Sequence, residues 1–134
     1  MGIDVPIVVY THTDMKDVWS MFFGQLKKYL PNNKIYVVVN EDDTQLSDMI
    51  RIIYDDTKPY TERWKEALPQ INEETIIFLH EDMILFDEVD MSYIQRYYDL
   101  VNSGMVESIK MIYTNSTNPP SDIDSTLVNS TFSI

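Results

Sequence analysis

The sequence predicts an α/β fold in which a mainly parallel sheet lies between two layers of helices. Short, nearly continuous apolar runs recur along the chain and alternate with segments of helical periodicity. Such runs are typical of strands that are buried on both faces, as in a parallel sheet covered by helices. The chain has 134 residues, which suggests one domain, and 44% of them are apolar, which is enough for a core.

The strands are predicted from apolar runs that end in polar turn residues. The first is PIVVY at 6–10 and the second is IYVVV at 35–39. Further strands are expected at 49–54, 75–79 and 105–113. We expect the strand at 75–79 to be central in the sheet, and the apolar run at 83–86 to continue it after a kink.

Helices are predicted where apolar residues recur every three or four positions. Residues 15–30 have this pattern, and so do residues from Tyr60 to about Leu68. A third helix is expected at 92–103, with Ser92 as its N-cap and Gly104 just after its end.

The end of the chain differs in composition from the rest. Residues 115–134 are rich in Asn, Ser, Thr and Pro, so we expect a polar tail or loop there and one α/β domain at 1–114.

The charge excludes several classes of partner. Ten basic and 22 acidic residues give a formal net charge of −12, which argues against nucleic acid and anionic membranes as partners.

The chain has no cysteine, so thiolate chemistry and disulfides are excluded. The N-terminus lacks the features of a signal peptide and no apolar run is long enough to span a membrane, so we expect a cytoplasmic protein.

Polar residues follow four of the predicted strands, at 11–14, 40–43, 55–57 and 80–82. Because parallel strands end at the same edge of a sheet, where α/β folds bind ligands, we expect a functional site at this edge. The first of these segments contains no glycine, so a dinucleotide-binding or phosphate-binding glycine loop is excluded.

Glu81 and Asp82 are the candidate metal ligands. Two adjacent carboxylates at a strand end can share Mg²⁺ or Mn²⁺, and the metal would neutralise a diphosphate leaving group. The alternative is that Asp82 caps a turn while Glu81 is solvated. His80, just before them, is expected to hydrogen-bond a neighbour rather than bind the metal.

Four further residues are candidates for binding a substrate. Asp55 could accept a hydrogen bond from a ribose or a base, or it could form a turn. Thr11 and Thr13 could offer hydroxyl and backbone groups to a nucleotide near a helix N-terminus. Arg63 could bind a phosphate through two N–H groups, or it could pair with an acidic residue on the surface.

The chain resembles the N-terminal, nucleotide-binding part of GT-A-type glycosyltransferases, the nucleotide-diphospho-sugar transferase superfamily. The resemblance covers most of residues 6–86. It rests on the stretches PIVVYTHTDMKDVWSMFFGQLKKYLP, IYVVVNED, IIYDD, PYTERWKEAL and IIFLHEDMILF. It implies a GT-A-like fold that is truncated here, with Thr11, Thr13 and Asp55 at the nucleoside.

The resemblance also places the family's metal-binding DxD motif at residues 80–82. Asp82 would then be the main ligand, with Glu81 as its partner and Mn²⁺ or Mg²⁺ as the cofactor. The motif departs from the family pattern, because Met83 stands where a second ligand is often found. No residue in the sequence stands out as the catalytic base.

The sequence therefore leaves two main hypotheses of function. One is a glycosyltransferase that binds a metal-complexed nucleotide sugar and transfers the sugar to an acceptor. The alternative is a minimal, non-catalytic domain of the same fold that acts in binding or assembly as a homodimer. A phospho-acceptor receiver domain using Asp55 or Asp56 is a weaker alternative, since the acidic pair expected near the N-terminus of a receiver is absent.

Overall fold

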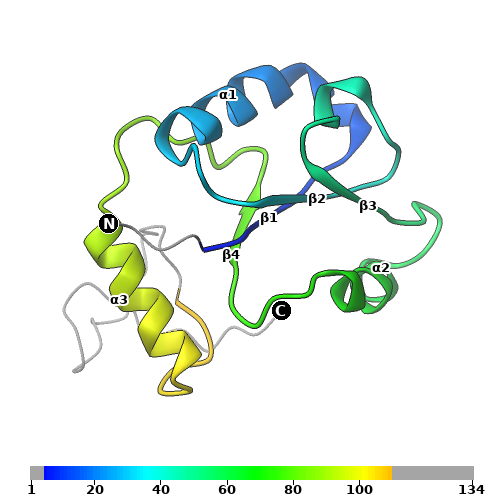
Figure 1. Cartoon of the computed structure of the whole chain (residues 1–134). Helices are drawn as coiled ribbons and strands as arrows, with labels where there is room; N and C mark the ends of the chain where they lie inside the picture. Colours follow the sequence, from blue (N-terminus) through cyan, green and yellow to red (C-terminus); the bar gives the residue numbers. More distant parts are fainter. Residues whose placement is uncertain (1–4, 110–134) are drawn as a thin grey trace, which may run out of the picture. The chain divides into compact units, whose positions relative to one another are not determined.

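The computed structural model describes residues 5–109 of the chain (Figure 1). The chain forms two compact units, residues 1–91 and residues 92–134. The first unit contains a four-stranded sheet and the helices α1 and α2, and the second contains nearly all of α3. The tail predicted at 115–134 lies outside the described residues, so the predicted extent of the domain stays a prediction.

The sheet of the first unit is entirely parallel, as the sequence predicted. Its strands run in the order β3-β2-β1-β4. They are β1 (Ile7–Tyr10), β2 (Ile35–Val39), β3 (Ile50–Ile53) and β4 (Ile77–His80). Each matches a predicted strand to within two residues, because each apolar run is bounded by polar or turn-forming residues.

β1 and β2 occupy the centre of the sheet, and every residue of both strands is buried. Val8, Tyr10 and Val38 lie in a core cluster with Trp64 and Ala67 of α2. Side chains alternate along a strand, so the residues between them point to the other face of the sheet. The continuous apolar runs thus reflect burial on both faces.

β4 is an edge strand among the described residues, which corrects the prediction that it is central. It pairs with β1 alone, and three of its four residues are only half-buried. An apolar run shows that a strand is at least partly buried, but it does not show how many neighbours the strand has. Residues 83–86 do not continue β4, and residues 105–109, the described part of the predicted fifth strand, are not in a strand.

The first helical segment begins differently from the prediction. Residues Thr13–Val18 form a 3₁₀ helix, and the α-helix α1 covers Trp19–Tyr29. The side chain of His12 accepts a hydrogen bond from the backbone N–H of Asp14 and so caps the 3₁₀ segment. A side chain that bonds nearby backbone in this way competes with regular α-helix formation.

The helix α2 covers Tyr60–Ala67 and is followed by a 3₁₀ turn, Leu68–Gln70, which contains Pro69. Figure 1 shows α1 and α2 on opposite sides of the sheet. The first unit therefore has the three layers expected of an α/β/α fold.

The helix α3 covers Met91–Asn102 and begins one residue before Ser92, the predicted cap. Gly104 has a φ of 81°, as expected of a glycine that ends a helix. None of the helices in the described part of the chain is long and apolar enough to cross a membrane.

Candidate functional site

The order of the strands identifies a switch point between β1 and β4. From β1 the chain adds β2 and then β3 on one side, and β4 pairs on the opposite side of β1. In open α/β sheets, ligands bind outside the carboxyl ends of the strands at such a point. Tyr10 is paired with His80 in the sheet. The segments that begin at Thr11 and Glu81 therefore start side by side at the carboxyl ends of β1 and β4.

Arg63 of α2 joins the ends of β1 and β3. Its guanidinium donates hydrogen bonds to the Tyr10 hydroxyl at 2.9 Å, to the Asp56 carbonyl at 2.9 Å and to the Lys58 carbonyl at 2.8 Å. It also lies over the ring of Tyr54, 4.9 Å from the centroid. The bond to Tyr10 is the main cause that raises the pKa of Arg63 above its usual value. Arg63 therefore serves as a cross-link in this structure.

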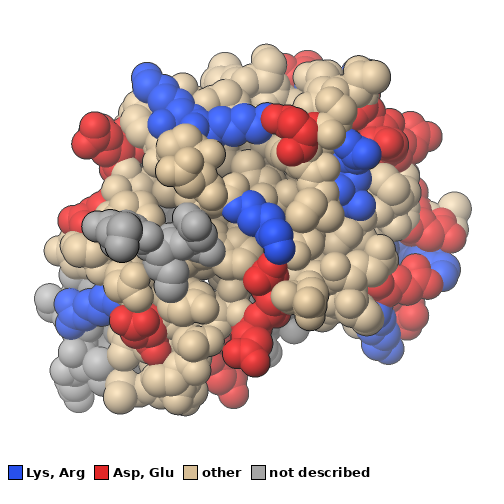
Figure 2. Space-filling view, viewed as in Figure 1, with Lys and Arg blue, Asp and Glu red and all other residues tan. Residues whose placement is uncertain are grey.

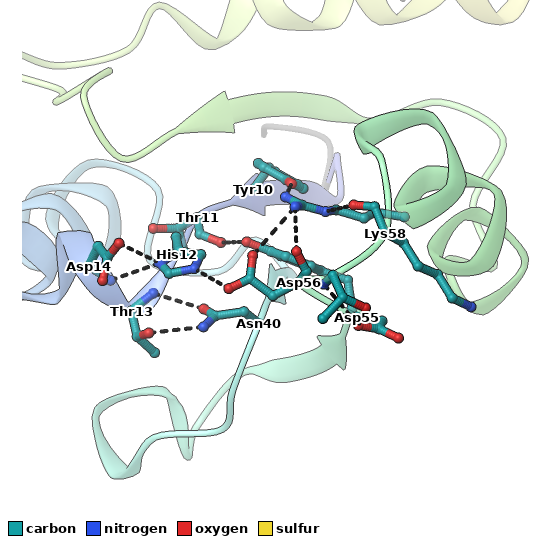
Figure 3. Close-up of polar contacts among 12 residues, drawn as sticks. Tyr10, Thr11, His12, Thr13, Asp14, Asn40, Asp55, Asp56 and Lys58 are labelled. Atoms are coloured by element: carbon teal, nitrogen blue, oxygen red, sulfur yellow. Dashed lines mark hydrogen bonds and ion pairs between the residues drawn. The ribbon is translucent and has the colours of Figure 1, made fainter.

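His12 and Asp56 form a second link across the same edge (Figure 3). Nε2 of His12 lies 2.8 Å from Oδ2 of Asp56, while Nδ1 accepts a hydrogen bond of 3.0 Å from the backbone N–H of Asp14. Because Nδ1 accepts this hydrogen bond, Nε2 is the ring nitrogen that donates to Asp56. Asp56 also lies 3.4 Å from Nη2 of Arg63.

Sequence reasoning missed the pair of His12 and Asp56 as a functional link. The two residues are 44 positions apart, and no spacing rule connects them. The available signal was that each follows a predicted strand, which places both residues at one edge of a parallel sheet without saying which side chains meet.

The two threonines predicted to bind a nucleoside are engaged within the protein. Thr11 is 2% exposed, and its hydroxyl accepts a hydrogen bond of 3.0 Å from the indole N–H of Trp19. Thr13 is linked to Asn40 by two hydrogen bonds, of 2.8 Å to its backbone N–H and 3.0 Å to its hydroxyl (Figure 3). These bonds tie the ends of β1 and β2 together, and the role of either threonine at a nucleoside stays a prediction.

Asp55 forms the turn that the sequence allowed as an alternative. Its Oδ1 accepts hydrogen bonds from the backbone N–H of Thr57 at 2.9 Å and from its hydroxyl at 2.6 Å. These bonds, the hydroxyl first, lower the pKa of Asp55 below its usual value, so it is an exposed carboxylate at neutral pH. A nucleoside could still approach its other oxygen, and that role stays a prediction.

Glu81 and Asp82 form the turn that follows β4. The backbone N–H of Met83 donates to the carbonyl of His80 at 3.0 Å and closes this turn. Glu81 is half-buried and Asp82 is exposed. Neither carboxylate is hydrogen-bonded or ion-paired to another residue in the range 5–109. Both carboxylates are therefore free of protein partners among the described residues, whereas Asp55 has one bonded oxygen and Thr11, Thr13 and Arg63 are bonded to other residues.

His80 packs through its ring, and the predicted hydrogen bond to a neighbour is not formed with any residue that the structure describes. Its imidazole makes edge contacts with Phe78, at 4.9 Å between centroids, and with Tyr10, at 5.8 Å. His80 therefore belongs to a group of contacting rings on the α2 side of the sheet, together with Tyr10, Trp64 and Phe78.

A metal that arrives with a phosphate ligand would need fewer protein ligands than one held by the protein alone. No three His, Cys, Asp or Glu side chains between residues 5 and 109 are grouped so that they could hold a metal by themselves. Mg²⁺ is commonly held by one or two carboxylates, with waters and substrate phosphates completing its coordination. Glu81 and Asp82 can supply that smaller set of ligands.

Basic and acidic side chains lie beside each other over the visible face (Figure 2). Ion pairs connect Lys16 with Asp43 at 3.2 Å, Lys34 with Glu73 at 3.0 Å and Arg51 with Asp42 at 3.2 Å. This face has no continuous basic patch that would follow a nucleic-acid backbone, in agreement with the net charge of −12.

No family model matches the sequence, and no curated protein or solved structure is similar enough to count as a match. The case for a function therefore rests on the site itself. Its main features are the parallel sheet, the switch point and the two available carboxylates beside it.

Proposed function

We propose that this chain binds a metal-complexed nucleotide sugar at the carboxyl edge of its sheet and transfers the sugar to an acceptor. One observation carries the proposal. Glu81 and Asp82 follow β4 at the switch point, beside the end of β1, and their carboxylates are unpaired among the described residues. The same site would take Mn²⁺ or Mg²⁺ as its cofactor.

The electrostatics of the chain support a role for the metal. A protein with a net charge of −12 repels a free diphosphate, and a divalent cation between carboxylates and phosphates removes that repulsion. The cation would also stabilise the charge that develops on a nucleoside diphosphate as the sugar leaves. Glu81 and Asp82 would hold the cation at the position where β1 and β4 end.

The other predicted residues would take part in different ways. Asp55 is exposed and keeps one carboxylate oxygen for a ribose or base donor. Thr13 follows β1, which is separated from β3 by β2, and it is bonded to Asn40 at the end of β2. Arg63 already donates one hydrogen bond from each of its three nitrogens, so only the remaining N–H groups of Nη1 and Nη2 would be left for a phosphate. Thr11 would support the site from the core.

A second function is favoured by these internal bonds. The side chains of Thr11, Thr13 and Arg63 all have protein partners, as expected of a domain that keeps the fold without the activity. A non-catalytic domain acting in binding or assembly would be folded, indifferent to Mn²⁺ and a homodimer.

Calorimetric titration with Mn²⁺ and a panel of UDP- and GDP-sugars separates the two proposals. We expect the wild type to bind at least one sugar nucleotide only when Mn²⁺ is present, and Asp82→Asn and Glu81→Gln to lose this binding. Glu88→Gln is the matched control, because it removes one exposed negative charge from the same loop. A folded wild type that binds none of these ligands would contradict the enzyme proposal.

A further inference from the structure

The segment that carries Glu81 and Asp82 is attached to α1 by two side chains. The side-chain amide of Gln25 donates a hydrogen bond to the carbonyl of Leu85 at 2.9 Å. The hydroxyl of Tyr29 donates a longer bond, of 3.4 Å, to the carbonyl of Phe86. In Figure 1 the chain after β4 runs beside α1, where these contacts are made.

The arrangement of these bonds makes a clamp, defined here as Gln25 and Tyr29 on the carbonyls of Leu85 and Phe86. The two donors are four residues apart on one helix, so they project from the same face and reach consecutive carbonyls. The turn from His80 to Met83 fixes the other side of Glu81 and Asp82. The two carboxylates therefore lie between two fixed points of the backbone.

The apolar residues of this segment hold it only in part. Residues 83–85 are half-buried, and Phe86 is 88% exposed, so the largest side chain of the segment contributes almost no burial. The backbone of residues 83–86 forms no strand or helix. Hydrogen bonds from α1 thus add to this partial burial in fixing its path.

We infer that Gln25 is a positioning residue for the metal site at Glu81 and Asp82. This inference rests on the proposed function. A cation gains most from carboxylates that are already ordered, and groups that orient the ligands from outside the coordination shell affect metal affinity measurably. Gln25 acts through the backbone and touches neither the metal nor the substrate.

The test compares Mn²⁺ affinity across matched variants, measured from the electron paramagnetic resonance signal of free Mn²⁺ with the same concentration of a UDP- or GDP-sugar in every sample. Gln25→Glu keeps the length of the side chain but replaces the N–H donor with an oxygen, and we expect Mn²⁺ binding about three- to tenfold weaker. Gln25→Lys keeps a donor of similar reach and should stay within about twofold of the wild type. Gln45→Glu adds the same charge at an exposed position away from the clamp, and its Mn²⁺ affinity should also stay close to that of the wild type.

A second measurement detects the clamp without metal. In the metal-free protein, we expect faster amide hydrogen exchange at residues 83–86 in Gln25→Glu than in the wild type or in Gln25→Lys. Equal Mn²⁺ affinity in the wild type and Gln25→Glu, with binding abolished by Asp82→Asn, would overturn the role of Gln25 and leave the proposed function standing. Equal weakening by Gln25→Glu and Gln25→Lys, or by Gln45→Glu, would also overturn it. A wild type that binds no Mn²⁺ in the presence of any UDP- or GDP-sugar of the panel would overturn both proposals.

Discussion

The substitution Thr11→Val separates a structural role for Thr11 from a direct role in binding. Valine has nearly the shape of threonine but cannot accept the hydrogen bond from the indole N–H of Trp19, which measures 3.0 Å. Trp19 is fully buried and Thr11 is 2% exposed, so water cannot replace the lost acceptor. The variant therefore leaves a buried donor without a partner.

The cost of that donor can be estimated from the burial of the pair. An unsatisfied buried polar group costs about 1–3 kcal/mol, and the shape of the site is otherwise kept. A loss of about 2 kcal/mol corresponds to a decrease in Tm of roughly 8 °C for a chain of this size. The backbone N–H of Thr11 still donates to Val38, so the end of β1 should stay in the sheet.

Urea denaturation of Thr11→Val, Trp19→Phe and the double variant measures the free energy of interaction between the two side chains. We expect an unchanged m-value and a coupling free energy of about 1–2 kcal/mol between the two positions. The reasoning is refuted if Thr11→Val unfolds within about 0.5 kcal/mol of the wild type. It is refuted most clearly if that stable variant also loses affinity for a nucleotide sugar, since the hydroxyl would then face the ligand.

Three other predictions concern the rest of the first unit. Arg63→Lys keeps the charge but loses the planar guanidinium that donates to Tyr10 and to two carbonyls, so the Tm of the variant should fall clearly. A Tm equal to that of the wild type would show that these hydrogen bonds are unimportant for stability. Lys34, and then Tyr36, lower the pKa of Glu73 below 4.5, so this carboxylate stabilises the fold above that pH and the contribution is lost as the pH falls through the lowered pKa. The stability difference between the wild type and Glu73→Gln should accordingly shrink in urea titrations below pH 4.5, and a constant difference would contradict this. Gly24 lies within α1, and a Cβ at this position would have no described atom within 4 Å beyond its chain neighbours and the backbone of the helix itself. Gly24→Ala should therefore stabilise the protein by about 0.5–1 kcal/mol in the same assay. A loss of stability would count against the helix as described.

The layout of the first unit could be predicted because local signals agreed with it. β1 and β2 are continuous apolar runs and are buried on both faces, and α2 ends next to Pro69. The position of β4 could not be predicted in the same way. An apolar run reports burial, while the number of neighbouring strands depends on contacts far away in the sequence.

The sequence predicted which residues lie at the carboxyl ends of the strands but not how their side chains are bonded. Parallel strands bring their carboxyl ends together, so the general placement of Thr11, Asp55 and Glu81 followed from the strand pattern alone. The partners of each side chain did not follow. Arg63 meets Tyr10 across 53 positions, and no local pattern encodes such a pair.

Paramagnetic broadening of amide signals by Mn²⁺ tests the central claim most directly, namely that the metal binds at the switch point between β1 and β4. We expect broadening in a ¹⁵N-labelled wild type, in the presence of a nucleotide sugar, to centre on Glu81 and Asp82 and to reach residues 11–13 at the end of β1. Residues at the amino ends of the strands, near Lys34, should keep sharp signals. Broadening centred instead on another part of the protein, such as the pocket lined by Asp42, Asp43, Thr44, Ser47 and Arg51, or no localised broadening at all, would contradict the account.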